Sequence, residues 1–129
     1  LTMDPLTTLS RNIESIKKEV LDFLNNAKAN NKIVHGYGAS TKGNTLLQQF
    51  GIDSELIPMI ADRNPLKFGA KTPGTNIPIV SEAHSKSFRP DFYFALPWHF
   101  RDSFLIREKS FLDNGGKFVF PLPNFEIVG

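Results

Sequence analysis

The sequence predicts an α/β domain built on a three-layer, doubly wound parallel sheet with helices on both faces. Short apolar runs alternate with helical patterns along the chain, which is typical of repeated strand–helix–strand units. The runs are continuous rather than alternating in polarity, as parallel strands covered on both faces are. A glycine-rich segment, Gly36–Asn44, separates the first run from the next helix. These observations favour a Rossmann-like sheet with strand order 3-2-1-4-5.

Length and composition exclude several classes of protein. The chain has 129 residues, 40% of them hydrophobic and 22% charged, which suits one domain with a proper core. It has no cysteine, and its net charge is +2. No apolar run approaches the roughly 18 residues of a membrane span, and no basic run is interleaved with aromatic residues. The three histidines are scattered and no carboxylate pair has the spacing of metal ligands, so we expect no metal site. We also expect a cytoplasmic protein without nucleic-acid or membrane partners.

A long helix is predicted at the N-terminus. Asp4 is a suitable N-cap, and Pro5 suits the first helical position. Apolar residues then recur every three or four positions, which gives one apolar stripe: Leu6, Leu9, Ile13, Ile16, Val20, Phe23 or Leu24, and Ala27. We expect residues 1–30 to form a connecting helix packed on a domain of residues 31–129. The first four residues look like a cut point, so we expect a fragment of a longer protein.

The remaining elements follow from apolar runs and from the residues that interrupt them. Strands are predicted at Lys32–His35, Glu55–Ala61, Ile77–Val80, Pro90–Pro97 and Lys117–Phe120, and helices at Asn44–Phe50, Ser81–Phe88 and Phe100–Asp113. Gly51 ends one helix. Pro58 argues against a regular second strand, because proline has no N–H to donate to a sheet hydrogen bond. Residues 125–128 form a possible edge strand. The segment Arg63–Asn76 is long for a compact domain, which favours a functional loop.

A ligand crevice is expected where the strand order reverses, beyond the carboxyl ends of the strands. Four segments should meet there: residues 36–44, 62–64, 73–75 and 97–99. The first is a partial dinucleotide fingerprint in which Thr41 replaces the third glycine. Its glycines permit a sharp turn, and the following helix start favours an anion. The same pattern also fits a tight turn without a ligand.

The other three segments each have a functional and a structural interpretation. Asp62 could accept hydrogen bonds from ribose hydroxyls, or cap the turn that follows it. Pro73 and Gly74 could bring backbone to the crevice, or form a plain type II turn. Trp98 could stack on a base and His99 could exchange protons. Equally, Trp98 could belong to the core and His99 could cap a helix.

A resemblance selects between these interpretations. Residues 37–47 resemble the signature of the C-terminal domain of sugar C-methyltransferases, which use S-adenosylmethionine to methylate a carbon of a nucleotide-linked keto-deoxysugar. Further segments match in the family's order: 62–69, 73–80, 98–100 and 115–123. The family has a zinc-binding N-terminal domain, a central methyl-donor domain and this Rossmann-like domain, which helps to hold the nucleotide-sugar and close the active site.

The resemblance implies a substrate-binding rather than a catalytic role for this chain. The family's catalytic Tyr/His segment and its S-adenosylmethionine site lie upstream, so we expect no cofactor on this chain and no activity from it alone. The upstream domain is an expected partner. His99 is the one candidate catalytic residue, and it stands where the family often has Asn. The expected substrate-binding residues are Gly38, Ala39, Ser40, Thr41, Lys42, Gly43, Asn44, Asp62, Pro73, Gly74, Trp98 and His99.

Two other functions are compatible with the pattern. The chain could be a stand-alone module that binds a dinucleotide or coenzyme A, because Gly36 and Gly38 are followed by Asp62 at a strand end. It could also be an interaction domain that has kept the loop without a ligand.

Overall fold

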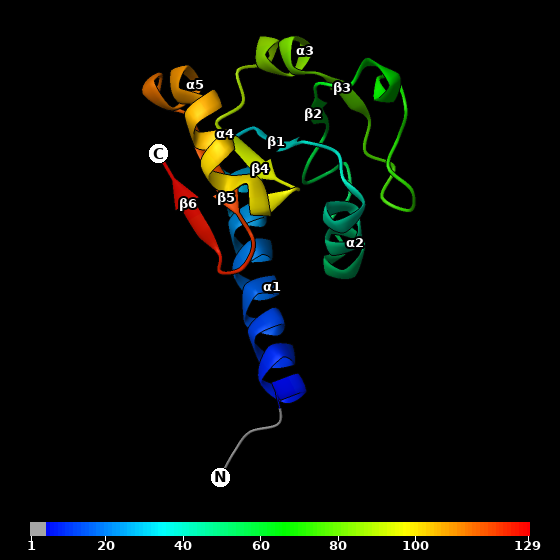
Figure 1. Ribbon diagram of the computed structural model, residues 1–129, viewed down its shortest axis with the longest axis vertical. Coiled ribbons are helices and arrows are strands. Elements are labelled where there is room, and N and C mark those ends of the chain that lie inside the picture. The colour runs from blue at the N-terminus through cyan, green and yellow to red at the C-terminus, as the bar shows by residue number, and fades with distance from the viewer. Residues whose placement is uncertain (1–4) are drawn as a thin grey trace.

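The computed structural model describes residues 5–129, with side chains from residue 12 onward. The predicted N-cap, Asp4, and the side chains of Leu6 and Leu9 lie outside the described part. Figure 1 shows a sheet with helices on both sides. The elements are α1 (Pro5–Ala29), β1 (Val34–Tyr37), α2 (Thr41–Phe50), β2 (Ile60–Asp62), η1 (Pro65–Lys67), β3 (Ile79–Ser81), α3 (Glu82–Ser87), β4 (Phe92–Ala95), η2 (Trp98–Phe100), α4 (Arg101–Arg107), α5 (Lys109–Asp113), β5 (Lys117–Phe120) and β6 (Glu126–Val128).

The sheet has the order β3-β2-β1-β4-β5-β6. Strands β1 to β5 pair in parallel, whereas β6 pairs with β5 in the antiparallel direction. The predicted α/β class and long N-terminal helix are confirmed. The sheet is mixed rather than purely parallel, because the chain returns along β5 after Phe120. The path from β1 runs outward to β3 and then crosses back to β4, so the order reverses between β1 and β4.

Each face of the sheet has its own apolar core. On one face, α1 and α2 pack through residues that include Val20, Leu24 and Leu47 against the alternate strand residues Val34, Ile60 and Phe94. On the other face, Phe104 of α4 packs with aromatic residues of the strands: Tyr37, Tyr93, Phe118 and Phe120. Successive strand residues point to opposite faces, which explains why neighbours such as Tyr93 and Phe94 belong to different cores.

The first strand begins and ends two residues later than predicted. Gly36 lies inside β1, where a Cβ would come 2.7 Å from Ile60 Cγ1, so this glycine allows close packing of two strands rather than a turn. The turn begins at Gly38, whose φ is +80°. Helix α2 begins at Thr41 instead of Asn44, because the side chain of Ser40 caps it. Gly51 ends α2 in the left-handed conformation, as predicted.

Several other predicted elements are shorter than expected; β4, for example, covers Phe92–Ala95 instead of Pro90–Pro97. Strand β2 contains three residues, because the amides of Leu56 and Ile57 bond back to the carbonyl of Asp53 and form a turn. The predicted helix over residues 100–113 is divided at Glu108, where φ is −103° and ψ is 30°. The carboxylate of this residue is buried, and its partners belong to the site described below.

A buried histidine under α3 makes stability depend on pH. His35 Nδ1 lies 2.7 Å from Ser85 Oγ, which lies 2.8 Å from the hydroxyl of Tyr93. Burial, and to a lesser extent His84, lowers the pKa of His35 from 6.5 to about 4. Between these two values the unfolded chain binds a proton that the folded chain does not, so stability falls as pH falls through this window.

We expect the wild type to lose about 3 kcal/mol of stability through this group between pH 7 and pH 4. Urea unfolding at several pH values measures the loss. His35→Gln removes the titrating group and flattens the profile, whereas substitution of the exposed His84 by Gln changes it little. Parallel profiles for wild type and His35→Gln would contradict this assignment.

Candidate functional site

The loop between β1 and α2 ends in a capped helix start. Ser40 Oγ accepts a hydrogen bond from the Gly43 amide at 3.1 Å, and the Ser40 carbonyl accepts one from Asn44 at 2.9 Å. The amides of Thr41 and Lys42 have no hydrogen-bond partner in the part of the chain that the structure describes. Free amides at the positive end of a helix attract anions.

Asp62 fastens this loop to the end of β2. Its Oδ2 accepts from the Ala39 amide and its Oδ1 from the Asn64 amide, each at 2.8 Å. Lys67 Nζ donates to the Ala39 carbonyl at 3.0 Å and lies 3.8 Å from Asp62 Oδ2. Asp62 is 9% exposed. The carboxylate therefore holds the loop and caps the following turn, which was the structural alternative for this residue.

The segment around Pro73 is tied to the first two turns of α2. Asn44 Nδ2 donates to the Pro73 carbonyl at 3.0 Å, and Gln48 Nε2 donates to the same carbonyl at 2.7 Å. Asn44 Oδ1 accepts from Thr75 Oγ1 at 2.9 Å. Gly74 has a φ of +77° and lies against Gln48. Both polar atoms of Asn44 are thus used to place this loop beside the helix start.

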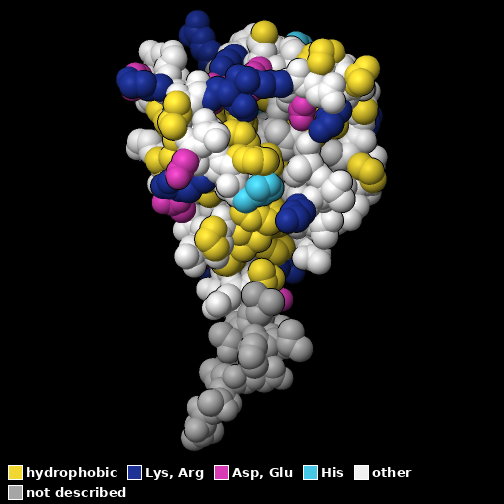
Figure 2. All heavy atoms as spheres, in the orientation of Figure 1, with side chains coloured by type: hydrophobic (Ala, Val, Ile, Leu, Met, Phe, Trp, Pro, Cys, Tyr) yellow, Lys and Arg dark blue, Asp and Glu magenta, His cyan; other side chains and the backbone are white. Residues whose placement is uncertain are grey.

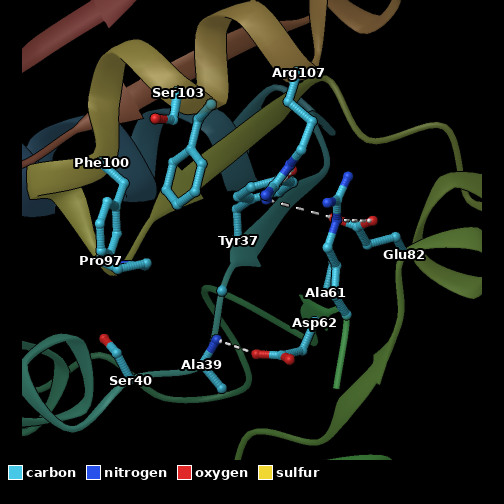
Figure 3. A pocket seen from close by; sticks show the side chains of 13 residues that line it. Tyr37, Ala39, Ser40, Ala61, Asp62, Glu82, Pro97, Phe100, Ser103 and Arg107 are labelled. Carbon is cyan, nitrogen blue, oxygen red and sulfur yellow. Dashed lines mark hydrogen bonds and ion pairs between the residues drawn. The ribbon is translucent and has the colours of Figure 1, made fainter. Parts of the chain in front are cut away.

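Two hollows lie on either side of the loop and share Ala39 and Ser40 as a common wall. The larger, which we call the cleft, has a volume of about 520 Å³ and is lined by Tyr37, Gly38, Ala39, Ser40, Ala61, Asp62, Arg63, Glu82, Pro97, Phe100, Ser103, Phe104 and Arg107 (Figure 3). The smaller, the lysine hollow, has a volume of about 320 Å³ and is lined by Ala39, Ser40, Thr41, Asn44, Lys67, Lys71, Thr72, Pro73 and Ile79.

One wall of the cleft comes from a segment that was not predicted to reach it. Phe100, Ser103, Phe104 and Arg107 occupy positions i, i+3, i+4 and i+7, so they share one face of α4 and the turn before it. That spacing was visible in the sequence. A helix was predicted over Phe100–Asp113, and no site residue was assigned to it.

Five predicted site residues line neither hollow: Lys42, Gly43, Gly74, Trp98 and His99. Lys42 and Trp98 line a separate hollow beside Ile13 and Leu122, and Trp98 packs against both cores. His99 is exposed, and its ring centroid lies 4.3 Å from that of Phe100. The chain segment 97–99 reaches the cleft through Pro97 instead, which lies against Gly38.

Charged side chains of the cleft form a connected row. Arg63 Nε donates to Glu82 Oε1 at 3.2 Å, and Arg107 Nη2 lies 3.9 Å from Glu82 Oε2. Arg107 also donates from Nε and Nη2 to the hydroxyl of Tyr37, at 3.0 and 2.8 Å. The Tyr37 hydroxyl itself donates to Glu108 Oε2 at 2.6 Å.

On the face in Figure 2, Lys and Arg side chains gather mainly over the upper half, beside hydrophobic ones.

The described part of the chain contains neither a metal-binding cluster nor a membrane-spanning helix. No group of three or more His, Cys, Asp or Glu residues is arranged to hold a metal ion there. None of the described helices combines the length and the apolar character needed to cross a membrane.

Comparison with known proteins identifies the family. Residues 1–123 match the model of the C-methyltransferase C-terminal domain. The chain is similar to the C-methyltransferase NovU of Streptomyces niveus, with 35% identity over 115 residues, which are 89% of this chain and 27% of that protein. The sequence resemblance is thus confirmed at the level of the family: the chain belongs to the C-methyltransferase C-terminal domain family.

Proposed function

We propose that this chain is the C-terminal domain of an S-adenosylmethionine-dependent C-methyltransferase and helps to hold a nucleotide-linked keto-deoxysugar. A phosphate of the ligand lies over the start of α2, in the lysine hollow, and the rest of the ligand extends into the cleft. The observation that carries this proposal is the position of the capped helix start between the two hollows, in a chain of this family.

The lysine hollow has the chemistry that a phosphate needs. The unpartnered amides of Thr41 and Lys42 supply donors, and the α2 dipole adds positive potential. Lys67 and Lys71 line the same hollow. Lys71 has no ion-pair partner within residues 12–129, so its charge remains available for an anion. A diphosphate could therefore gain both backbone and lysine contacts there.

The cleft suits the less charged parts of such a ligand. Its volume lies within the several hundred Å³ of typical small-molecule sites. Phe100 is 52% exposed at its wall, and Ser103 lies on the same helical face. Aromatic rings and hydroxyls of this kind bind sugars and bases.

The methyl donor is assigned to the part of the protein outside this chain. In a nucleotide site of this topology, an acidic residue after the second strand holds ribose hydroxyls. Both oxygens of Asp62 already accept a backbone amide, which leaves this carboxylate fewer lone pairs for that role. The same observation weighs against a dinucleotide-binding module. The chain matches 27% of the length of its relative NovU, which leaves ample length for a donor domain in a protein of that size.

The domain's contribution to the reaction is to bind and orient the sugar. A base supplied by the rest of the protein removes a proton beside the keto group, and the resulting enolate carbon takes the methyl group. Binding of the phosphate and the nucleobase then holds the reacting carbon near the methyl donor. Closure of this domain over the substrate would also exclude water from the enolate.

Methyl transfer by the full-length protein tests the proposal. We expect the protein that carries this chain, given S-adenosylmethionine and a thymidine-diphosphate keto-deoxysugar, to add one methyl group to carbon, seen by mass spectrometry and NMR. The isolated chain is expected to show no turnover. The proposal would be contradicted if a nicotinamide dinucleotide stabilised the protein and no keto-sugar nucleotide were methylated.

Lysine substitutions test where the phosphate lies. We expect Lys71→Ala in the full-length protein to weaken binding of a thymidine-diphosphate sugar about fivefold, the effect of one charge-assisted contact. Lys42→Ala removes the same charge from the neighbouring hollow and should change binding less than about twofold. Calorimetric titration at low salt measures both, because screening reduces such effects. A larger loss for Lys42→Ala would place the phosphate elsewhere.

A further inference from the structure

Glu108 interrupts a helix in order to place a carboxylate under the cleft. Its side chain is 4% exposed, and the backbone leaves helical geometry at this residue. Burying a carboxylate costs free energy, and apolar residues of similar size would often serve stability as well or better. A buried carboxylate at a helix break therefore points to a role beyond packing.

The carboxylate is the centre of a chain of donors that ends at Arg107. Lys86 Nζ donates to Glu108 Oε1 at 2.7 Å, and the Tyr37 hydroxyl donates to Glu108 Oε2 at 2.6 Å. Since its one proton points to Glu108, the hydroxyl oxygen of Tyr37 accepts from Arg107. Burial, with the hydrogen bond to Glu108, raises the pKa of Tyr37 far above its ordinary value, which keeps that proton in place.

The Arg107 side chain is also held by two aromatic rings. Its guanidinium carbon lies 5.3 Å from the ring centroid of Tyr37 and 5.1 Å from that of Phe104. Figure 3 shows Arg107 reaching from α4 across Tyr37 toward Glu82. Hydrogen bonds and stacking together fix a side chain that would otherwise lose considerable rotamer entropy on binding a ligand.

Part of this fixed guanidinium still faces the cleft. The side chain is 32% exposed, and its Nη1 has no hydrogen-bond partner among the described residues. Glu82 is 3.9 Å away and is shared with Arg63, so it neutralises neither arginine fully. A guanidinium offers five N–H donors in a plane, and here two of them are used by Tyr37.

We propose that Arg107 is the ligand-contacting cation of the cleft and that Tyr37 and Glu108 are the positioning residues that hold it. The group it takes is an oxygen acceptor of the ligand, either a base carbonyl or a phosphate oxygen, in the planar geometry that arginine binds well. This inference rests on the proposed function, because it names the contact through which the same ligand is recognised in the cleft.

Two arginine-to-lysine variants of the full-length protein test the inference. Arg107→Lys keeps the charge but loses the planar fork, and Arg101→Lys is the matched control. Arg101 lies on the same helix, stacks over Phe120 at 5.6 Å and pairs with Glu126, outside the cleft. We expect Arg107→Lys to weaken thymidine diphosphate binding about tenfold or more, with little change in melting temperature, and Arg101→Lys to bind like wild type.

Separate titrations with thymidine and with inorganic pyrophosphate distinguish the two acceptor groups. If Arg107→Lys loses affinity for thymidine alone, Arg107 binds the base carbonyl. If it loses affinity for pyrophosphate alone, Arg107 binds a phosphate oxygen. Either result supports the inference. Equal affinity of Arg107→Lys and wild type for all three probes would overturn it while leaving the proposed function intact. If wild type binds none of the three probes, the inference and the binding role proposed for the domain both fail.

Tyr37→Phe tests the positioning role. It removes the hydroxyl that holds Arg107 and leaves the arginine and the stacked ring in place. We expect a severalfold rise in KM for the nucleotide-sugar at nearly constant kcat, because the lost interaction belongs to binding. A normal KM in a folded Tyr37→Phe protein would show that the hydroxyl only supports the fold, and would remove Tyr37 from the proposal.

Discussion

Replacement of Glu108 by Ala is expected to destabilise the domain by about 2 to 3 kcal/mol. The substitution leaves the buried hydroxyl of Tyr37 without its acceptor and leaves a cavity between α4 and α5. Lys86, which is 45% exposed, can turn to water, and this keeps the loss below that of a fully buried pair. Urea unfolding monitored by circular dichroism measures the effect.

Asp113→Ala is the matched control for this substitution. Asp113 is also an acid paired with a lysine, Lys109, at 2.7 Å, but its side chain is 61% exposed. Exposed pairs contribute little, so we expect a change within about 0.5 kcal/mol. Equal losses for Glu108→Ala and Asp113→Ala would contradict the view that Glu108 anchors a buried network.

Gly43→Ala is expected to destabilise by about 2 kcal/mol or more and to weaken ligand binding as well. Gly43 is buried in the first turn of α2. An added Cβ would overlap Leu96 Cβ and lie 2.9 Å from both Leu96 Cα and Ser40 Oγ. Because one contact is backbone and another is the capping hydroxyl, the helix start itself has to move.

Gly51→Ala provides the comparison for this prediction. Gly51 ends the same helix at a φ of +71°, with no atom within 4 Å of an added Cβ. Its replacement costs about 1 kcal/mol of backbone strain and leaves the helix start unchanged. We therefore expect both variants to lower the urea midpoint, but Gly43→Ala alone to weaken nucleotide-sugar binding. Normal binding by Gly43→Ala would show that the ligand does not contact the start of α2.

The parts of the fold that depend on local sequence were predictable. The apolar stripe of α1 is confirmed within the described residues by the burial of Ile16, Val20 and Leu24. Gly51 ends α2, and the edge piece at residues 125–128 appears as β6. The register of β1 was not predictable, because Gly36 has the same conformational freedom in a turn as in a strand. Its contact with Ile60 decides the outcome, and that contact is not local.

The candidate site was predictable in its location more than in its contacts. The four segments expected at the crevice do meet. Asp62 accepts a hydrogen bond from the Ala39 amide, the Pro73 carbonyl accepts one from Asn44, and Pro97 lies against Gly38. The roles of individual side chains depend on partners distant in sequence. Arg107 is held by Tyr37, which lies 70 positions away, and no spacing in the sequence reveals such a pair.

A charge placed at the start of α2 tests the central claim most directly. Thr41 is exposed at the first position of the helix. An acidic residue there stabilises the helix by interacting with its dipole, but it repels a phosphate. Calorimetry with a thymidine-diphosphate sugar would compare the full-length wild type, Thr41→Glu and Gln49→Glu, which adds the same charge to the far end of α2. We expect Thr41→Glu to keep its stability and lose binding at least tenfold, with Gln49→Glu close to wild type. Unchanged affinity in Thr41→Glu would contradict the account, because the phosphate would then lie away from the helix start.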